Sequence, residues 1–214
     1  MKHTISLLTL FIMIFSLPGC GGGIYDWGKG VFYQGKTLSY DKEIPEQYIR
    51  SVIVYDQFAT KGDFNVLWLS DAVRIAYADL YAVHHGKSEE KKQAVLRRQL
   101  AENQHYIVFY VLSSYNDVLG EIDSLWTLFL QVGDDYFEPV EIKAIDMEQE
   151  YRLFFGKRYD RFKTAYRVKF DAKAVDDSMI INEGTDGLIL HFRSLEKQVQ
   201  LVWEVDLEQN GFVN

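Results

Sequence analysis

Residues 164–170 read TAYRVKF, and large apolar side chains alternate with small or charged ones along the whole segment. Tyr166, Val168 and Phe170 therefore fall on one face of an extended chain, whereas Arg167 falls on the other. A two-residue period of this kind is typical of a β-strand that buries one face. The segment predicts a strand whose apolar face packs against a core.

Runs of β-branched and aromatic residues on both sides of this segment predict further strands. They are residues 106–112 (YIVFYVL), 124–132 (SLWTLFLQV), 136–145 (YFEPVEIKAI), 187–192 (GLILHF) and 198–205 (QVQLVWEV). The run at 136–145 contains Pro139, and proline in a strand favours the edge of a sheet. We therefore expect an edge strand there.

A hairpin is expected earlier in the chain. Residues 51–58 (SVIVYDQF) and 64–69 (FNVLWL) have strand character, and TKGD at 60–63 lies between them. Because Gly62 can adopt a positive φ, these four residues are predicted to form the connection.

The apolar spacing then changes to that of a helix. Val73, Tyr77 and Leu80 lie on one stripe of a 3.6-residue period, which predicts a helix over about residues 71–85. Ser70 is suited to cap its first turn.

Together these elements predict a mainly β fold of the α+β class, an immunoglobulin-like β-sandwich formed by residues 49–214. The helix at 71–85 and a second at about 88–103 form a segment inserted between the early and late strands, on one side of the sandwich. The second helix has a thin apolar face, so it is expected at the surface. The paired cysteines of immunoglobulin domains are missing, so the likeness concerns architecture alone.

The amino terminus has the composition of an export signal. A basic start is followed by an uncharged run of 13 residues at 5–17 (ISLLTLFIMIFSL), too short to cross a bilayer. We therefore expect residues 1–19 to be a signal peptide. Residues 20–48 are rich in glycine and are expected to form a tether, with a short strand at about 31–33.

Leu17-Pro18-Gly19-Cys20 resembles the lipobox of bacterial lipoproteins. The resemblance implies cleavage before Cys20, diacylglycerol on its sulfur and an acylated amino terminus, with palmitate as the lipid label. It also implies attachment to the bacterial cell envelope. Gly21 after the cysteine implies the outer membrane, with the protein facing the periplasm. No cofactor beyond this covalent lipid is expected.

Charge and cysteine content exclude several classes of protein. The net charge is −8 and becomes −9 once Lys2 is removed with the signal, so nucleic-acid binding is not expected. A single cysteine excludes an internal disulfide framework and a multi-cysteine metal site.

Candidate catalytic and metal-binding groups are weak in this sequence. His84 and His85 are neighbours, and neighbouring side chains on a helix diverge by about 100°, so they are not expected to share a metal ion. Their position suits the negative end of the helix dipole. The oxygen-rich loop at 176–186 lacks an EF-hand spacing and is expected to be solvated. Ser113 and Ser114 lack the G-x-S-x-G pattern of a nucleophile elbow.

Residues 151–162 (YRLFFGKRYDRF) place cations beside aromatic rings in an otherwise acidic chain. Arginine and tyrosine dominate the contacts of many recognition surfaces. The expected partner-binding residues are Tyr151, Arg152, Arg158, Tyr159 and Arg161. The competing interpretation is that the aromatic rings close the open end of the sandwich while the cations remain in solvent.

Two functions remain open on the sequence alone. The favoured one is a membrane-anchored envelope lipoprotein that acts as a non-catalytic binding or assembly module for an envelope protein. The alternative is an envelope hydrolase or a carbohydrate-binding accessory protein. An aromatic cleft with converging carboxylates would favour the alternative.

Overall fold

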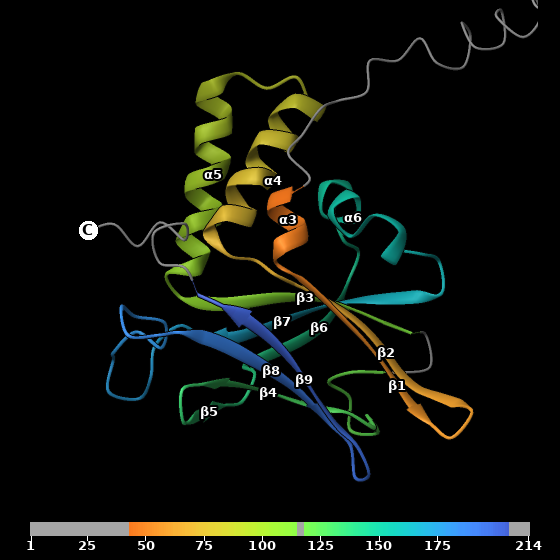
Figure 1. Ribbon diagram of the computed structural model, residues 1–214. Helices are drawn as coiled ribbons and strands as arrows, with labels where there is room; N and C mark the ends of the chain where they lie inside the picture. Colours follow the sequence, from red (N-terminus) through yellow and green to blue (C-terminus); the bar gives the residue numbers. More distant parts are fainter. Residues whose placement is uncertain (1–42, 115–117, 206–214) are drawn as a thin grey trace, which may run out of the picture. The chain divides into compact units, whose positions relative to one another are not determined.

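A computed structural model describes residues 43–114 and 118–205 of the chain (Figure 1). As predicted, the described part is mainly β, with two antiparallel sheets of nine strands in all and four α-helices, consistent with a β-sandwich. The predicted signal peptide, Cys20 and the short strand at 31–33 lie outside the described residues.

The larger sheet has five strands in the order β1-β2-β3-β7-β6. These are β1 (Ile49–Asp56), β2 (Ala59–Trp68), β3 (Tyr106–Ser114), β7 (Lys163–Asp171) and β6 (Glu141–Ile145). Residues 164–170 lie in β7, and the predicted inner residues Tyr166, Val168 and Phe170 are buried. The two-residue period therefore identified the correct face.

The smaller sheet has four strands in the order β5-β4-β8-β9. They are β5 (Asp135–Phe137), β4 (Thr127–Val132), β8 (Gly187–Arg193) and β9 (Gln198–Glu204). Rings from both sheets meet in the core: Phe64 of β2 stacks on Phe192 of β8 with centroids 4.3 Å apart, and Phe109 of β3 lies 5.3 Å from Trp203 of β9. Burial of these rings is the main force that holds the sheets face to face.

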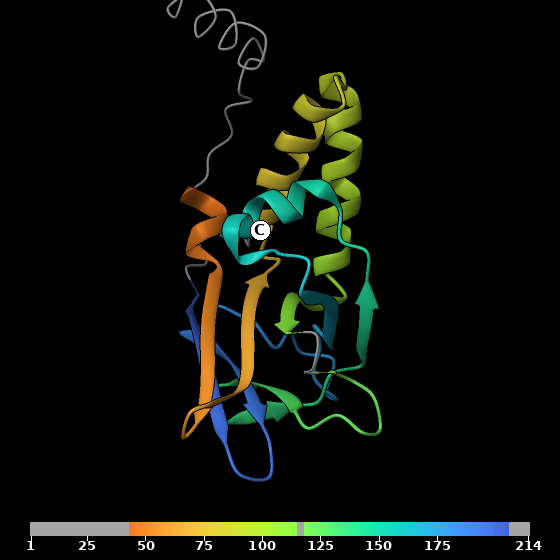
Figure 2. The ribbon, with the colours of Figure 1, turned by 90° about the vertical axis from the view of Figure 1, so that its right-hand side faces the viewer.

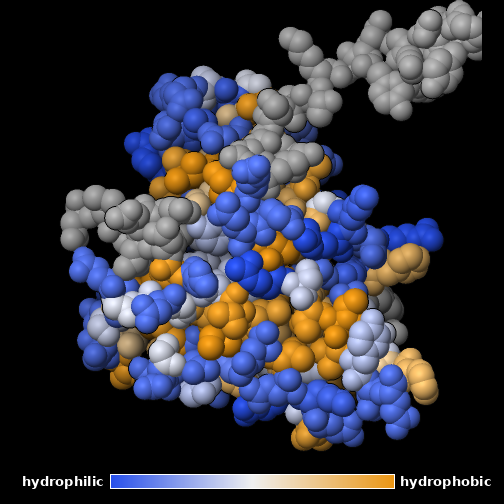
Figure 3. All heavy atoms as spheres, viewed as in Figure 1, coloured by the Kyte–Doolittle hydropathy of each residue, from blue (hydrophilic) through white to orange (hydrophobic). Residues whose placement is uncertain are grey.

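The edges β1 and β9 lie side by side without forming a ladder. Arg50 Nε donates to the carbonyl of Val202 at 2.8 Å, and its guanidinium lies 5.8 Å from the centroid of the Trp203 ring. Figure 3 shows apolar side chains gathered over the middle of this face. Arg50 therefore supplies a hydrogen-bond donor to a backbone carbonyl of the edge strand β9, where such groups would otherwise lack a partner in the sheet.

Four helices gather at one end of the sheets rather than along one side (Figures 1 and 2). They are α3 (Glu43–Gln47), α4 (Asp71–His84), α5 (Glu89–Asn103) and α6 (Gln149–Phe155), and a 3₁₀ turn, η1 (Gly156–Arg158), follows α6. Helix α4 begins as predicted, because the Ser70 side chain accepts from the amide of Val73. Helix α5 has no buried residue, as its thin apolar face indicated. Within the described ranges, no helix has the length and apolar character needed to cross a membrane.

A buried polar network joins α4 and α5 to the larger sheet. Arg74 of α4 is 1% exposed, and its guanidinium donates to Glu102 at 2.8 Å and to the side chains of Gln99 and Asn103. Lys169 of β7 reaches the other oxygen of Glu102 at 2.6 Å. Buried charges require such partners, so this network fixes where the helices meet the sheet.

Two predicted boundaries are wrong. The hairpin turn consists of Gln57 and Phe58, with Gln57 at a φ of 52°, and Gly62 lies inside β2 opposite Val54. The run at 136–145 is divided between β5 and β6, which belong to different sheets. Pro139 lies between the two strands, so its lack of a backbone N–H removes no hydrogen bond from either sheet.

The described fold also includes two helices that were not predicted, and the first of them lies in residues assigned to the tether. Helix α3 precedes the expected start at residue 49, and Pro45 and Tyr48 are buried against the rest of the fold. Helix α6 occupies residues for which no helix was predicted. Its seven residues are too few to show a clear helical period.

Candidate functional site

The predicted cationic aromatic segment begins in the core rather than at the surface. Tyr151 in α6 is 1% exposed. Its ring stacks on Tyr77 with centroids 4.4 Å apart and meets the edge of Tyr110 at 4.9 Å. Burial raises the pKa of Tyr151 well above its ordinary value. Tyr151 therefore stabilises the contact of α6 with α4 and is not available to a partner in this conformation.

Arg152 and Arg158 lie near the surface and contact acidic neighbours. Arg152 donates to the Asp146 carboxylate and to the Met147 carbonyl. Arg158 makes two parallel bonds to the carboxylate of Glu46 in α3, one of them 3.0 Å long. The second pair joins segments 112 residues apart, so Arg158 holds η1 against α3.

The remaining part of the segment places cations beside rings: Tyr159 is partly buried against the core, whereas Arg161 and Phe162 are exposed. The guanidinium of Arg152 lies 5.2 Å from the centroid of the Tyr159 ring, and that of Arg161 lies 4.7 Å from Phe162. Phe162 is 63% exposed. We call Arg152, Arg158, Tyr159, Arg161 and Phe162 the cationic aromatic surface. This surface contains the predicted contact residues other than the buried Tyr151, and it adds Phe162.

A second feature is an open groove of about 900 Å³ beside β4 and β5. Trp126, Phe129 and Tyr136 supply aromatic surface, and Arg193 supplies a cation 4.7 Å from the Phe129 ring. The groove is lined by residues 120–122, 124, 126–129, 136–139, 142 and 193, which include Glu121 and Glu138. Exposed Ile122 and half-exposed Tyr136 make it an apolar surface with a few polar groups.

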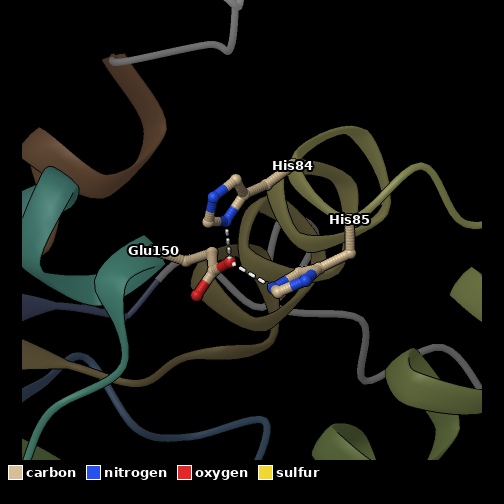
Figure 4. A group of neighbouring side chains, drawn as sticks. All are labelled: His84, His85 and Glu150. Carbon is tan, nitrogen blue, oxygen red and sulfur yellow. Dashed lines mark hydrogen bonds and ion pairs between the residues drawn. The ribbon is translucent and has the colours of Figure 1, made fainter.

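A third feature joins the end of α4 to the first turn of α6, and it consists of His84, His85 and Glu150. His84 Nδ1 lies 2.6 Å from Glu150 Oε1, and His85 Nε2 lies 3.1 Å from the same oxygen. Figure 4 shows both rings directed at that carboxylate from one side. Within residues 43–114 and 118–205, this is the one group of three His, Cys, Asp or Glu side chains whose ligand atoms converge, all within 4.8 Å of one another.

The expectation that the two histidine rings diverge is wrong, and the reason is where α4 ends. His84 is its last residue, and His85 is the C-cap with φ −98° and ψ 6°. Gly86 follows with a φ of 58°, a value that favours glycine. Because His85 has left the helix, its ring turns toward the same carboxylate as that of His84.

The surroundings of Glu150 keep it ionised. Its side chain is 4% exposed, whereas those of His84 and His85 are 38% and 42% exposed. Burial acts to raise the pKa of Glu150, but hydrogen bonds from His84 and the backbone, together with attraction to both histidines, hold that pKa below its ordinary value. A buried carboxylate thus lies beneath two imidazoles that reach solvent.

Tyrosine side chains border this cluster on α4. Tyr81 lies against the His85 ring with centroids 4.3 Å apart. Tyr77 lies one turn before Tyr81 on the same helix. Burial and the negative charges of Glu148 and Glu150 raise the pKa of Tyr77 to about 12. The Tyr77 phenol therefore remains neutral at physiological pH.

The other candidates from the sequence have local structural roles. Asp176 accepts from the amide and the hydroxyl of Ser178, and Asn182 accepts from the amide of Gly184. In both cases a side-chain oxygen accepts from a residue two positions later and closes a short turn. This agrees with the solvated loop that was expected here.

No protein-family model, curated protein or solved structure matches the chain.

Proposed function

We propose that this chain is a lipid-anchored lipoprotein of the bacterial cell envelope that acts as a non-catalytic binding or assembly module. The resemblance of residues 17–20 to a lipobox supports the anchor, and the chain's only cysteine stands at the position that the motif requires. Several acyl chains bind a bilayer strongly enough to make such an anchor permanent. The proposed location is the outer membrane, facing the periplasm.

The cationic aromatic surface supports the second half of the proposal. The observation that carries it is the exposed pair of Arg161 and Phe162, with guanidinium and ring 4.7 Å apart. Arg152 and Arg158 add positive charge in the same segment, and their pairs with Asp146 and Glu46 are partly exposed, so solvent weakens the attraction within each pair. An acidic envelope protein would be attracted here and repelled by the rest of a chain with a net charge of −9.

The anchor is tested by labelling cells with radioactive palmitate. Wild-type protein is expected to incorporate label and to fractionate with the outer membrane, whereas Cys20→Ala is expected to do neither. Equal labelling of both proteins would refute the anchor.

The binding surface is tested by capture from detergent-solubilised envelope with tagged wild type, Arg158→Ala, Tyr159→Ala and Arg161→Ala. Truncation of a central contact typically costs about 2 kcal/mol or more, roughly a thirtyfold loss of affinity. Lys173→Ala is the matched control, because Lys173 is an exposed, ion-paired cation on a distant loop. An acidic partner lost from the three variants and kept by the control supports the proposal. Retention by all of them would contradict it.

The groove beside β4 and β5 favours a second candidate, a carbohydrate-binding accessory protein or a hydrolase. Aromatic rings stack on the apolar faces of sugars, and Phe129 and Tyr136 stand beside Glu138 in its wall. Oligomers of N-acetylglucosamine are suitable probes. Binding that is lost in Tyr136→Ala would favour this candidate. Hydrolysis of the oligomers that is lost in Glu138→Gln would favour the enzyme.

A further inference from the structure

We propose that His84, His85 and Glu150 bind a divalent transition-metal ion, with zinc as the best-fitting probe. The inference is independent of the proposed anchor and partner. It stands on the convergence of two imidazole nitrogens and one carboxylate oxygen from the end of α4 and the first turn of α6 (Figure 4).

The distances are close to those that an ion requires. A tetrahedral zinc ion with bonds of about 2.0–2.1 Å holds neighbouring ligand atoms about 3.3 Å apart. The two contacts to Glu150 Oε1 measure 2.6 and 3.1 Å, and the three ligand atoms lie within 4.8 Å of one another. Since both histidine rings are about two-fifths exposed, small rotations of these rings are enough to centre the three atoms on an ion.

The hydrogen bonds of the cluster show which atoms an ion would use. Each ring now donates an N–H to one ionised oxygen, and a divalent ion would take the place of these two protons. Each displaced proton moves to the other nitrogen of its ring where that nitrogen is bare, and otherwise to solvent. His84 would bind through Nδ1 with its proton on Nε2, and His85 would bind through Nε2 with its proton on Nδ1. Both rings would be neutral in the metal-bound form, as metal-ligating histidines are.

The donor set selects the class of metal. Imidazole nitrogens suit zinc, copper, nickel and iron, whereas magnesium and calcium prefer oxygen ligands throughout. Two histidines and one carboxylate also form the protein ligand set of several zinc sites, in which water completes the coordination. Here the exposed side of the rings gives water that access.

The surroundings supply the support that metal sites need. The Tyr81 ring packs against His85 and restricts its rotation, and the amide of His85 donates to the carbonyl of Tyr81 at 3.0 Å. Glu150 is buried and fixed at the start of α6. An ion would therefore join two helices through ligands 65 residues apart in the chain.

The test is titration of the full-length protein in detergent, purified without a polyhistidine tag and stripped of metal with a chelator. Cobalt(II) is added first, because tetrahedral cobalt with nitrogen ligands absorbs in the visible range, and zinc then displaces it. The expected result is one equivalent of metal per chain. His84→Ala and His85→Ala should each weaken binding by about tenfold or more.

His105→Ala is the control, since His105 is exposed and lies outside the cluster. It should bind as tightly as the wild type. Zinc should also raise the unfolding temperature of the wild type but not that of the His84→Ala/His85→Ala double variant, because an ion stabilises only the form that binds it.

Two outcomes overturn the proposal. One is a wild type that shows no saturable binding of cobalt or zinc, in which case the histidines serve only to satisfy a buried carboxylate. The other is equal affinity in the wild type and the double variant, which would place the metal elsewhere in the chain.

Discussion

Tyr151 illustrates at the scale of one residue how surroundings determine a role. Its ring lies flat against Tyr77 and edge-on to Tyr110 and Phe154, with 1% of its surface exposed. Its hydroxyl makes a long contact of 3.4 Å to Gln99 and also interacts with the Arg74 side chain. The ring, which packs against three other rings, is therefore expected to supply most of its contribution to stability.

Substitution of Tyr151 separates these two parts. Tyr151→Ala should lower the free energy of unfolding by about 3–5 kcal/mol, since it leaves a cavity among aromatic rings. Tyr151→Phe should cost less, about 1 kcal/mol, because it keeps the ring and removes only the hydroxyl's contacts with Gln99 and Arg74. Urea unfolding followed by tryptophan fluorescence measures both values. Equal losses in the two variants would contradict the packing role.

Glu102 gives the fold a dependence on pH. Burial acts to raise the pKa of Glu102, but bonds and attraction from Lys169 and Arg74 outweigh it and leave that pKa below its ordinary value. The ionised form therefore stabilises the folded state. This contribution is complete above the ordinary pKa and is lost as the pH falls through the lower, folded-state pKa.

The stability of the wild type should thus fall as the pH is lowered below about 4.5. Glu102→Gln should be less stable than the wild type at neutral pH, because Arg74 loses its charged partner, and its stability should change less on acidification. Glu183→Gln, a change at an exposed carboxyl group, should keep the wild-type slope. Denaturant unfolding at a series of pH values measures these slopes, and parallel curves for the wild type and Glu102→Gln would exclude this role.

At the scale of elements, Gly62 has a packing role in β2 rather than a role in a turn. A Cβ at this position would lie 2.7 Å from the ring of Phe64 and 3.1 Å from that of Trp126. Phe64 is fully buried and stacked on Phe192, so its ring has little room to move. The glycine therefore allows the two sheets to close over this ring.

Gly62→Ala should accordingly lower the unfolding free energy by about 1–3 kcal/mol through overpacking. Gly184→Ala is the matched control, because the added Cβ would meet only Asn182 at an ordinary 3.4 Å. It should change stability by about 0.5 kcal/mol or less. Thermal unfolding of both variants is sufficient to compare them, and a neutral Gly62→Ala would show that the core relaxes around it.

The elements that could be predicted from the sequence are those with a long, regular period. Strand β7 and helix α4 have one apolar face each over many residues, so both were located within about two residues. The boundary between β5 and β6 was missed because the apolar character continues across Pro139 while the chain changes sheet. Helix α6 was missed because a seven-residue helix that buries four of its residues has no clear polar face.

The candidate sites depend on the whole molecule, and only part of each could be predicted. Arg158 was expected at a surface, but its partner Glu46 lies 112 residues away. The histidine pair was noticed, yet its convergence on Glu150 depends on where α4 ends and on how α6 packs against it. Contacts between distant segments follow from packing, and a local pattern carries no information about them.

The charge distribution of the whole molecule leads to a further prediction for the proposed partner. A cationic aromatic surface on a chain with a net charge of −8 should bind an acidic protein partly through attraction that salt screens. At about 0.1 M salt the screening length is near 10 Å, and it shortens as salt is added. Capture of the partner by the wild type should therefore decrease as the salt concentration rises.

Two neighbouring variants divide this binding into its charged and apolar parts. Arg161→Ala removes a charge, so it should bind more weakly at low salt and show a shallower dependence on salt than the wild type. Phe162→Ala keeps the charge and removes a ring that is 63% exposed, so it should weaken capture at every salt concentration while the slope stays that of the wild type. Affinity measurements at several salt concentrations distinguish the two cases. If the slopes of all three proteins coincide, charge on this surface does not contribute to binding, and the attraction argued from the net charge of the molecule fails.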